Sequence, residues 1–453
     1  MSEAAILEER FIPPAPVPGA RDPSLLRQLT TVMSRPIEGW PRALFEARVW
    51  SPPLPGMPLY ISDPAANREI FVDQAANFPQ GALFRRMMRP VWGEGMVSSE
   101  GPAWRWQRQA TSPAFRPAQM TALAPIMSRA AQGALDRWRT SGQIDMAEET
   151  GHITFDILLD AVLSGGEDFD RAVVRERVTR FMDQLARYRL SYFLAPDSHH
   201  EHRLTPAAPE ASDLRRDVEA MIRRRRTAPP RGDLVDMLLA ARDPETGQGM
   251  DDAILRDNLL GFIVAGHETS AIALAWALYI LAAHAPTAER VRAEVAAVAG
   301  DAPLGAGHVA GLVFTRQVIS ETMRLYPPAY MATRVCLATT EVAGIPVKAG
   351  RRVLIPTYAL HRHRRHWRDP DVFDPGRFAP GQPAPDRHLY MPFGAGPRVC
   401  LGAAFAMTEL VVTLATLARG ADFRLDPNHR VWPSGSLTLR PEGGLPMAVT
   451  MRG

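Results

Sequence analysis

The sequence contains very few cysteines: Cys336 and Cys400 are the only two among 453 residues. Two thiols cannot build the disulfide framework of a small secreted protein, nor provide the four cysteine ligands of an ordinary iron–sulfur cluster. With 46% hydrophobic residues, the chain can bury a large core without covalent cross-links. The low cysteine content therefore indicates a reducing compartment, and we expect a cytoplasmic protein.

The chain also lacks a strong net charge and an N-terminal apolar run. Its formal net charge of +3 is small for its length and does not indicate binding to nucleic acid. The N-terminus has neither the basic start nor the apolar stretch of a signal peptide or membrane anchor. The longest apolar stretch, 259–283, is interrupted by His267, Glu268 and Thr269, which favours a buried helix over a membrane span.

The hydrophobic pattern predicts a mainly helical chain with small β-sheets, an α+β protein in which helix dominates. Length alone is compatible with two or three domains, but we expect a proline-rich segment over 1–22 and one catalytic domain over 23–453. The longest predicted helix covers 251–282, with Asp251 as its N-cap, and further helices hold 315–325 and 403–417. Short strands are predicted over 59–62, 332–335, 340–342, 352–355, 436–440 and 448–451.

The glycine-rich loop before the last helix carries the strongest chemical signal. It reads Phe393-Gly-Ala-Gly-Pro-Arg-Val-Cys-Leu-Gly402. Glycines allow a tight turn close to a large ligand, and backbone N–H groups at a helix start stabilise a thiolate at Cys400. Arg398 could pair with a carboxylate of the same ligand. The alternative is an ordinary buried free cysteine at a loop-to-helix turn.

The spacing Phe-x-x-Gly-x-Arg-x-Cys-x-Gly resembles the cysteine-ligand signature of the cytochrome P-450 family at all five fixed positions. The resemblance implies the mainly helical P-450 fold, a triangular helical prism around a buried haem b. It makes Cys400 the axial thiolate ligand of the haem iron, and therefore the metal ligand. It also places Phe393, Gly394 and Gly402 against the cofactor and Arg398 on a haem propionate.

A second signal is Ala265-Gly-His-Glu-Thr-Ser270 inside the long helix. A charged group and a hydroxyl in an apolar helix cost free energy unless they have partners. Taken alone, Glu268 could sit in a salt bridge and Thr269 could bond its own helix. The segment also resembles the oxygen-activation motif of the family, which implies that Glu268 and Thr269 deliver protons during catalysis. Ala265 and Gly266 would then adjoin the haem.

Two further constellations resemble the family. Glu321 and Arg324 share a helix face at i, i+3, and with Arg377 they are expected to form a buried network that supports the haem loop. Gly376 stands where the family commonly has glutamate, but Arg377 is retained.

Trp104 and Arg108 lie one turn apart and could simply belong to an amphipathic helix with a core tryptophan and a solvated arginine. The resemblance instead places both of them, together with Arg334, at the haem propionates.

The reaction implied is monooxygenation: dioxygen is activated and an apolar small molecule is hydroxylated or epoxidised. The chain has no flavin or nicotinamide fingerprint, so electrons would come from a separate ferredoxin or flavodoxin with an NAD(P)H-dependent reductase, steered by basic residues such as Arg105 and Arg108. The alternatives are a peroxide-dependent peroxygenase and a haem-based sensor or carrier. Expected substrate-pocket residues are Phe84, Val97, Phe262, Tyr330, Met331 and Ser436.

Overall fold

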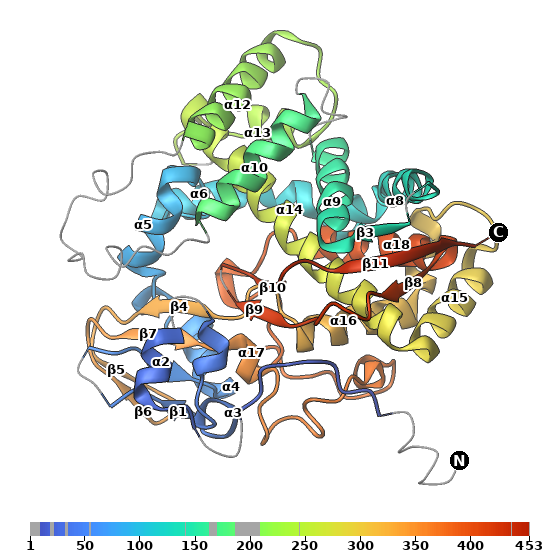
Figure 1. The fold of residues 1–453 in the computed structure, drawn as a ribbon. Helices are drawn as coiled ribbons and strands as arrows, with labels where there is room; N and C mark the ends of the chain where they lie inside the picture. The colour runs from blue at the N-terminus through green and yellow to red at the C-terminus, as the bar shows by residue number, and fades with distance from the viewer. Residues whose placement is uncertain are drawn as a thin grey trace.

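The computed structural model describes residues 10–18, 22–31, 35–53, 56–140, 142–162, 170–185, 209–243, 245–435 and 437–452. Helices form most of the described chain, and small sheets lie on two sides of the helical body (Figure 1). The predicted mainly helical class with small sheets is therefore confirmed.

Short elements alternate in the N-terminal third. They are α2 (Leu25–Thr31), η1 (Pro36–Gly39), α3 (Ala43–Glu46), β1 (Val49–Trp50), β2 (Leu59–Ile61), α4 (Pro64–Arg68), η2 (Glu69–Asp73), η3 (Ala75–Asn77), α5 (Gly81–Trp92), α6 (Gly101–Thr111), η4 (Ser112–Phe115) and α7 (Pro117–Ala122).

Longer helices fill the middle of the chain. They are α8 (Ala124–Trp138), α9 (Met146–Val162), α10 (Arg171–Leu185), α12 (Pro209–Thr227), α13 (Leu234–Ala240), α14 (Asp252–Ala283), α15 (Ala285–Ala299) and α16 (Val313–Leu325), with β3 (Gln143–Asp145) before α9 and η5 (Ala306–Gly311) before α16.

The C-terminal third returns to short elements around one helix. They are β4 (Ala332–Val335), β5 (Thr340–Val342), β6 (Ile345–Val347), β7 (Arg352–Ile355), α17 (Thr357–Leu360), η6 (Pro375–Phe378), η7 (Gly396–Arg398), α18 (Ala403–Gly420), β8 (Ala421–Leu425), β9 (Pro433–Gly435), β10 (Leu439–Pro441) and β11 (Pro446–Met451).

Helix α14 crosses the molecule and organises it (Figure 1). Its predicted N-cap is confirmed: the Asp251 carboxylate accepts a 2.7 Å hydrogen bond from the backbone N–H of Ile254. Helices α9, α12 and α18 all pack against it. Because the helix is apolar on nearly every side, it is stable only when it is surrounded by other elements in this way.

The sheets are short, and most predicted strands are confirmed. The largest has the order β1-β2-β7-β4, in which β2 and β7 run parallel and the other pairs antiparallel. A second sheet has the order β3-β11-β8. The strand predicted over 436–440 is observed only at residues 439 and 440, in β10, which pairs with β9 so that Leu439 lies opposite Gly435. Ser436, between these strands, lies outside the described residues.

Two apolar clusters form the centre of the core, one around the C-terminal half of α14 and one around its N-terminal half. In the first, the rings of Trp276 and Tyr326 stack at 3.9 Å between centroids. The Tyr326 hydroxyl donates a 2.7 Å hydrogen bond to the carbonyl of Pro14. This bond ties the described part of the proline-rich N-terminal segment to the main body.

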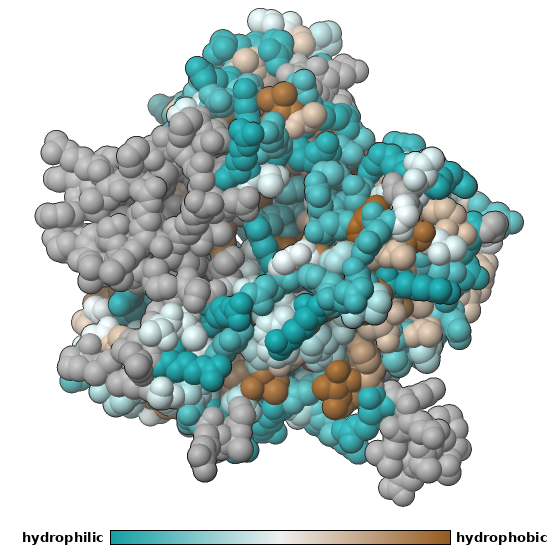
Figure 2. Space-filling model, viewed as in Figure 1, coloured by the Kyte–Doolittle hydropathy of each residue, from teal (hydrophilic) through white to brown (hydrophobic). Residues whose placement is uncertain are grey.

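Helices α14 and α18 are long and apolar enough to cross a membrane by length and composition alone. In the structure, 78% of the most apolar window of α14 and 67% of that of α18 are buried inside the protein. Both therefore pack as core helices. The face shown in Figure 2 is mostly hydrophilic over α10 and α12, with apolar residues scattered in small groups.

Candidate active site

The loop that carries Cys400 is fixed by backbone hydrogen bonds and by glycine. The N–H of Cys400 donates a 2.9 Å hydrogen bond to the carbonyl of Phe393, which closes the loop. Gly394 and Gly396 have φ angles of 74° and 71°. A Cβ atom at Gly396 would lie 1.9 Å from the carbonyl oxygen of Phe71, so only glycine fits there.

Cys400 has solvent-exposed surface, yet many protein atoms surround its thiol, as expected for a group in a concave surface. The residue is exposed by surface area, yet burial among neighbouring atoms raises the pKa of its thiol, and the Gly402 backbone N–H and the Arg108 charge oppose that rise. The position of Cys400 just before a helix predicts that backbone N–H groups and the helix start stabilise the thiolate. Desolvation outweighs these two effects, so the thiol form is favoured in the free protein. A bound metal ion would reverse this balance, because a coordinating thiol is deprotonated.

Three arginines gather near the cysteine loop, all partly desolvated. Burial lowers the pKa of Arg108, of Arg398 and of Arg334, the last to about 10. The positive charge of Arg398 further lowers the pKa of Arg334, and the Glu100 carboxylate opposes this. A cluster in which positive charges exceed the negative ones is stabilised by an anionic ligand, such as a pair of carboxylates.

The contacts of Arg398 define the edge of this cluster. Its guanidinium donates 2.6 Å and 2.5 Å hydrogen bonds to the carbonyl of Ser99 and the carboxylate of Glu100. Its Cζ lies 4.6 Å from the ring centre of Trp104. The Ser99 hydroxyl is buried without a hydrogen-bond partner among the described residues. An unpaired buried hydroxyl beside clustered arginines suits the carboxylates of a haem.

Helix α14 exposes one small patch in its middle. Ala265 is exposed and Gly266 and Thr269 are half-buried, whereas most of the helix is buried. The three positions are spaced as one face of a helix. The Thr269 hydroxyl donates a 2.9 Å hydrogen bond to the carbonyl of Ala265, and a Cβ atom at Gly266 would lie 3.2 Å from Leu158. Gly266 therefore allows close packing of Leu158 from α9, while Ala265 and Thr269 present small side chains and one hydroxyl at the accessible face.

Glu268 lies on a different face of α14 from Thr269. Its Oε1 atom accepts hydrogen bonds of 2.6 Å from the Thr438 hydroxyl and of 2.9 Å and 2.6 Å from the Arg440 guanidinium. Glu268 therefore does form a salt bridge, the alternative that its sequence context left open. His267, at the variable position of the motif, is buried, and desolvation lowers its pKa to about 4.

The expected substrate-pocket residues divide into two groups. Phe84, Val97 and Phe262 are partly buried and pack against the same apolar cluster, together with Leu437. By contrast, the side chain of Tyr330 is only 1% exposed, within the main core. Met331 packs, partly buried, against that main core.

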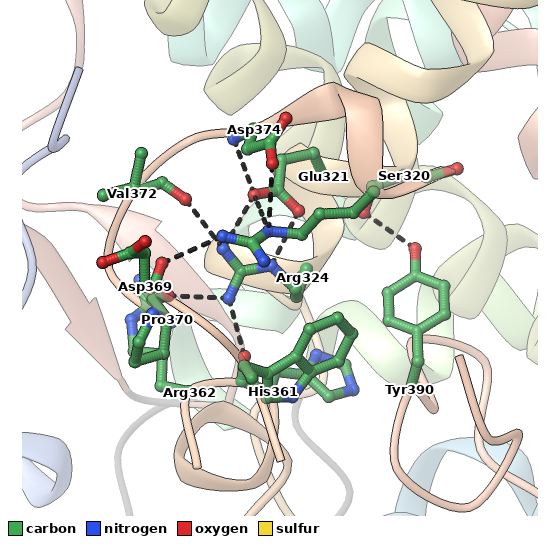
Figure 3. Close-up of polar contacts among 12 residues, drawn as sticks. Ser320, Glu321, Arg324, His361, Arg362, Asp369, Pro370, Val372, Asp374 and Tyr390 are labelled. Atoms are coloured by element: carbon green, nitrogen blue, oxygen red, sulfur yellow. Dashed lines mark hydrogen bonds and ion pairs between the residues drawn. The ribbon is translucent and has the colours of Figure 1, made fainter. Parts of the chain in front are cut away.

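The predicted charge network is assembled with all three members. Arg324 donates two 2.7 Å hydrogen bonds to the two carboxylate oxygens of Glu321, and both side chains are fully buried (Figure 3). Arg377 donates to the same carboxylate at 3.4 Å. Arg324 also donates to the carbonyls of His361 and Pro370, so the pair holds together the chain segments that precede the cysteine loop.

Sequence reasoning missed four residues that contact the site: Glu100, Leu437, Thr438 and Arg440. Each is distant in sequence from its partner, and no motif marks it. Leu437 and Thr438 adjoin Ser436, which was named, so a wider window around that position would have included them.

The comparisons with known proteins agree with this geometry. The sequence model for "Cytochrome P450" matches residues 55–445. The chain is 33% identical to cyclooctat-9-en-7-ol 5-monooxygenase of Streptomyces melanosporofaciens, covering 77% of this chain and 76% of that protein. It is 30% identical to cyclooctatin synthase of the same organism, covering 84% of each.

Among solved structures, the crystal structure of a cytochrome P450, CYP102L1, superposes with a TM-score of 0.81 at 27% identity, over 98% of this chain and all of that chain. The expected P-450 fold is thereby confirmed. By fold and by sequence, the chain belongs to the cytochrome P450 family of haem-thiolate monooxygenases.

Proposed function

We propose that the protein binds haem b through the thiolate of Cys400 and oxidises an apolar small molecule with dioxygen and electrons from a separate redox protein. The observation that carries this proposal is the accessible patch in the middle of α14, a mostly buried helix, where Ala265 is exposed and Gly266 and Thr269 are half-buried. Haem held at Cys400 would supply the reductive activation of dioxygen, as thiolate ligation favours O–O cleavage.

The reaction balances as one substrate C–H bond, one dioxygen, two electrons and two protons giving one C–OH group and one water. An alkene substrate would yield an epoxide with the same balance. The protein's part is to supply the two protons at the right place, and Thr269 and Glu268 are the proposed groups. The Thr269 hydroxyl can hold a water or a proton at the exposed patch, while Glu268 exchanges protons through water.

The arginine cluster would hold the cofactor carboxylates. Arg108, Arg334 and Arg398 offer guanidinium groups whose burial is costly without anionic partners. Trp104 stacks on Arg398 and restricts its orientation. Phe393 packs against the main core beside the cysteine loop, and Gly394 and Gly402 keep the loop free of side chains that would obstruct the ring.

An apolar substrate is supported by the side chains around the predicted pocket. Phe84, Val97, Phe262 and Leu437 offer partly buried apolar surface and no charge. One relative is named for its action on cyclooctat-9-en-7-ol, a largely hydrocarbon alcohol. We propose a substrate of similar character: a terpenoid, a fatty acid or another lipid-like compound.

The electrons are proposed to come from a ferredoxin or flavodoxin with its NAD(P)H-dependent reductase, and the protein is proposed to act in the cytoplasm as one catalytic domain over 23–453. Arg105, which is exposed, is three residues from Arg108 and shares its helix face. Positive charge on this face favours an acidic electron donor near the thiolate.

The test begins with a library of apolar compounds, screened for a spin-state change in the haem absorption spectrum of the loaded protein. Each compound that binds is then incubated with ferredoxin, reductase and NADPH, or with peroxide alone. The proposal expects an oxygenated product in the first mixture, with one oxygen atom from ¹⁸O₂. Product only with peroxide would indicate a peroxygenase, and product in neither would indicate a sensor or carrier; both results would overturn the proposal.

A further inference from the structure

Glu268 is held from outside its own helix by the β9–β10 hairpin. Thr438 and Arg440 together direct three hydrogen bonds to one oxygen of its carboxylate, Oε1. Arg440 also donates to the Thr438 hydroxyl at 3.3 Å, which links the two donors. The Glu268 side chain is 7% exposed and that of Arg440 is 35% exposed, so the carboxylate is shielded while its cation reaches solvent.

The hairpin that carries these donors is itself anchored to α14. The indole N–H of Trp276, two turns along the helix from Glu268, donates a 2.8 Å hydrogen bond to the carbonyl of Leu439. The N–H of Leu439 in turn donates a 3.1 Å bond to the carbonyl of Pro328. Residues 438 and 440 flank this fixed point, so their side chains approach Glu268 from a backbone that has little freedom.

The two carboxylate oxygens of Glu268 are consequently unequal. Oε1 accepts three hydrogen bonds, which fully occupy its two lone pairs, whereas Oε2 is buried and accepts none from the described residues. An unpaired buried carboxylate oxygen is costly unless it meets water or a proton. Oε2 is therefore the oxygen of Glu268 that is left to bind a water molecule or a proton.

We propose that Thr438 and Arg440 are positioning residues for proton delivery, which fix the Glu268 carboxylate so that Oε2 is the atom that releases and regains the proton. This inference rests on the proposed function, in which Glu268 takes part in the proton supply. The step moves one proton from Oε2 through water to the oxygen site and returns one from solvent to Oε2. No electrons pass through Glu268; they come from the redox donor.

A purely structural role for the same contacts makes a different prediction. If Arg440 only closed the hairpin, its loss would destabilise the hairpin whether or not residue 268 could carry a proton. If it positions Glu268, its effect disappears once Glu268 is replaced by glutamine. The two roles can therefore be separated by a double-mutant cycle.

The experiment compares Arg440→Gln, Arg440→Lys and Thr438→Val, each in the natural protein and in Glu268→Gln, with Arg424→Gln as the control. Arg424 is an exposed residue on β8. Product formed per NADPH consumed is measured with ferredoxin and reductase. The substrate dissociation constant from the spin-state change and the unfolding temperature are measured in parallel, as readouts that do not depend on turnover.

Positioning predicts that Arg440→Gln lowers product per NADPH about tenfold, that Arg440→Lys recovers part of this loss, and that the substrate dissociation constant does not change. Turnover driven by peroxide, which brings its own protons, stays within about twofold of the natural protein. When Glu268→Gln is already present, adding Arg440→Gln causes no further loss of product per NADPH. The decrease in unfolding temperature of this double variant is not the sum of the decreases in the two single variants.

The proposal is overturned if Arg440→Gln forms as much product per NADPH as the natural protein, or if it lowers the peroxide-driven rate as much as the NADPH-driven yield. It is also overturned if Arg440→Gln lowers product per NADPH by the same factor in Glu268→Gln as in the natural protein. Failure of the proposed function looks different: the unsubstituted protein then forms no product from dioxygen at all, or Glu268→Gln itself has no effect on product per NADPH.

Discussion

At the scale of single residues, Thr269 stands out because its hydroxyl is both hydrogen-bonded and accessible. It donates to the carbonyl of Ala265 one turn back on α14, which leaves its oxygen free to accept a further hydrogen bond. Cys336, the second cysteine, is fully buried, and burial raises the pKa of its thiol. The accessible Thr269 hydroxyl is thus available for chemistry, whereas the buried Cys336 thiol is a structural group.

Thr269→Ala is expected to uncouple oxygen consumption from product formation. Removal of the hydroxyl takes away a proton donor at the exposed patch, so more oxygen is released as peroxide, with a loss of product per NADPH of about tenfold. Thr269→Ser, which keeps a hydroxyl, is the control and should retain most of the coupling. Equal coupling in Thr269→Ala and the natural protein would remove Thr269 from the proton supply.

The motif residues were predictable because the chemistry demands a residue type at a fixed local spacing. Cys400 and Arg398 lie within three residues of each other, and Glu321 and Arg324 lie one helical turn apart. The partners of Glu268 could not be predicted in this way, since Arg440 is 172 residues away in sequence. Only the packing of the hairpin against α14 brings the two side chains together.

At the scale of elements, the buried ion pair on α16 connects that helix to the segment before the cysteine loop. Glu321 and Arg324 have fully buried side chains and satisfy each other with two hydrogen bonds. An exposed pair of the same i, i+3 spacing is formed by Asp136 and Arg139, with side chains 57% and 59% exposed. The two pairs differ mainly in burial, so they form a matched comparison.

Glu321→Ala is expected to lower the free energy of unfolding by about 3–5 kcal/mol, because it leaves the Arg324 charge buried and unpaired. Asp136→Ala, the exposed control, should cost less than about 1 kcal/mol. Chemical denaturation of both variants checks this. A loss at Glu321 no larger than that at Asp136 would contradict the structural role assigned to the network.

Helix α18 carries a buried acid, Glu409, that faces Ser270 of α14. Glu409 is 1% exposed, and neither carboxylate oxygen has a hydrogen-bond partner among the described residues. Desolvation raises its pKa to about 8, although the side chain of Ser270 lies near enough to oppose the rise. The folded protein therefore holds a proton on Glu409 between about pH 4.5 and 8, where the unfolded chain has released it.

Because the folded state binds this extra proton, stability should fall as pH rises through that window. Glu409→Gln, which stays neutral, should remove the dependence and become more stable than the natural protein by about 1.4 kcal/mol for each pH unit above the usual glutamate pKa. Denaturant unfolding at pH 5, 6 and 7, with Asp136→Asn as the control, measures the slope. Parallel slopes for Glu409→Gln and the natural protein would show that Glu409 is not protonated in the fold.

At the scale of the whole molecule, the long helices and the order of the strands were predictable, but the way they meet was not. The predicted N-cap of α14 and the strands β4, β5 and β7 appear where the sequence placed them. The β9–β10 hairpin was not predicted, because β9 lies before the strand predicted over 436–440 and only residues 439 and 440 of that strand lie in β10. The hairpin of β9 and β10 is held in place by its contacts with α14, which the local sequence does not reveal.

The charge on the outer surface predicts how the electron donor associates. Arg105→Glu is expected to slow association with an acidic ferredoxin about tenfold at low ionic strength, and the effect should shrink as salt screens the surface charges. Stopped-flow reduction at increasing salt measures this. Arg424→Glu, on β8, should have little effect; equal slowing by both variants would place the docking face elsewhere.

The most direct test of the account is the absorption spectrum of the reduced protein with carbon monoxide. With Cys400 as the axial ligand, the natural protein should show the red-shifted Soret band that marks thiolate-ligated haem. Cys400→Ser should lose that band while keeping the helical content measured by circular dichroism. If Cys400→Ser retained the red-shifted band, the thiolate would come from elsewhere and the central assignment would be wrong.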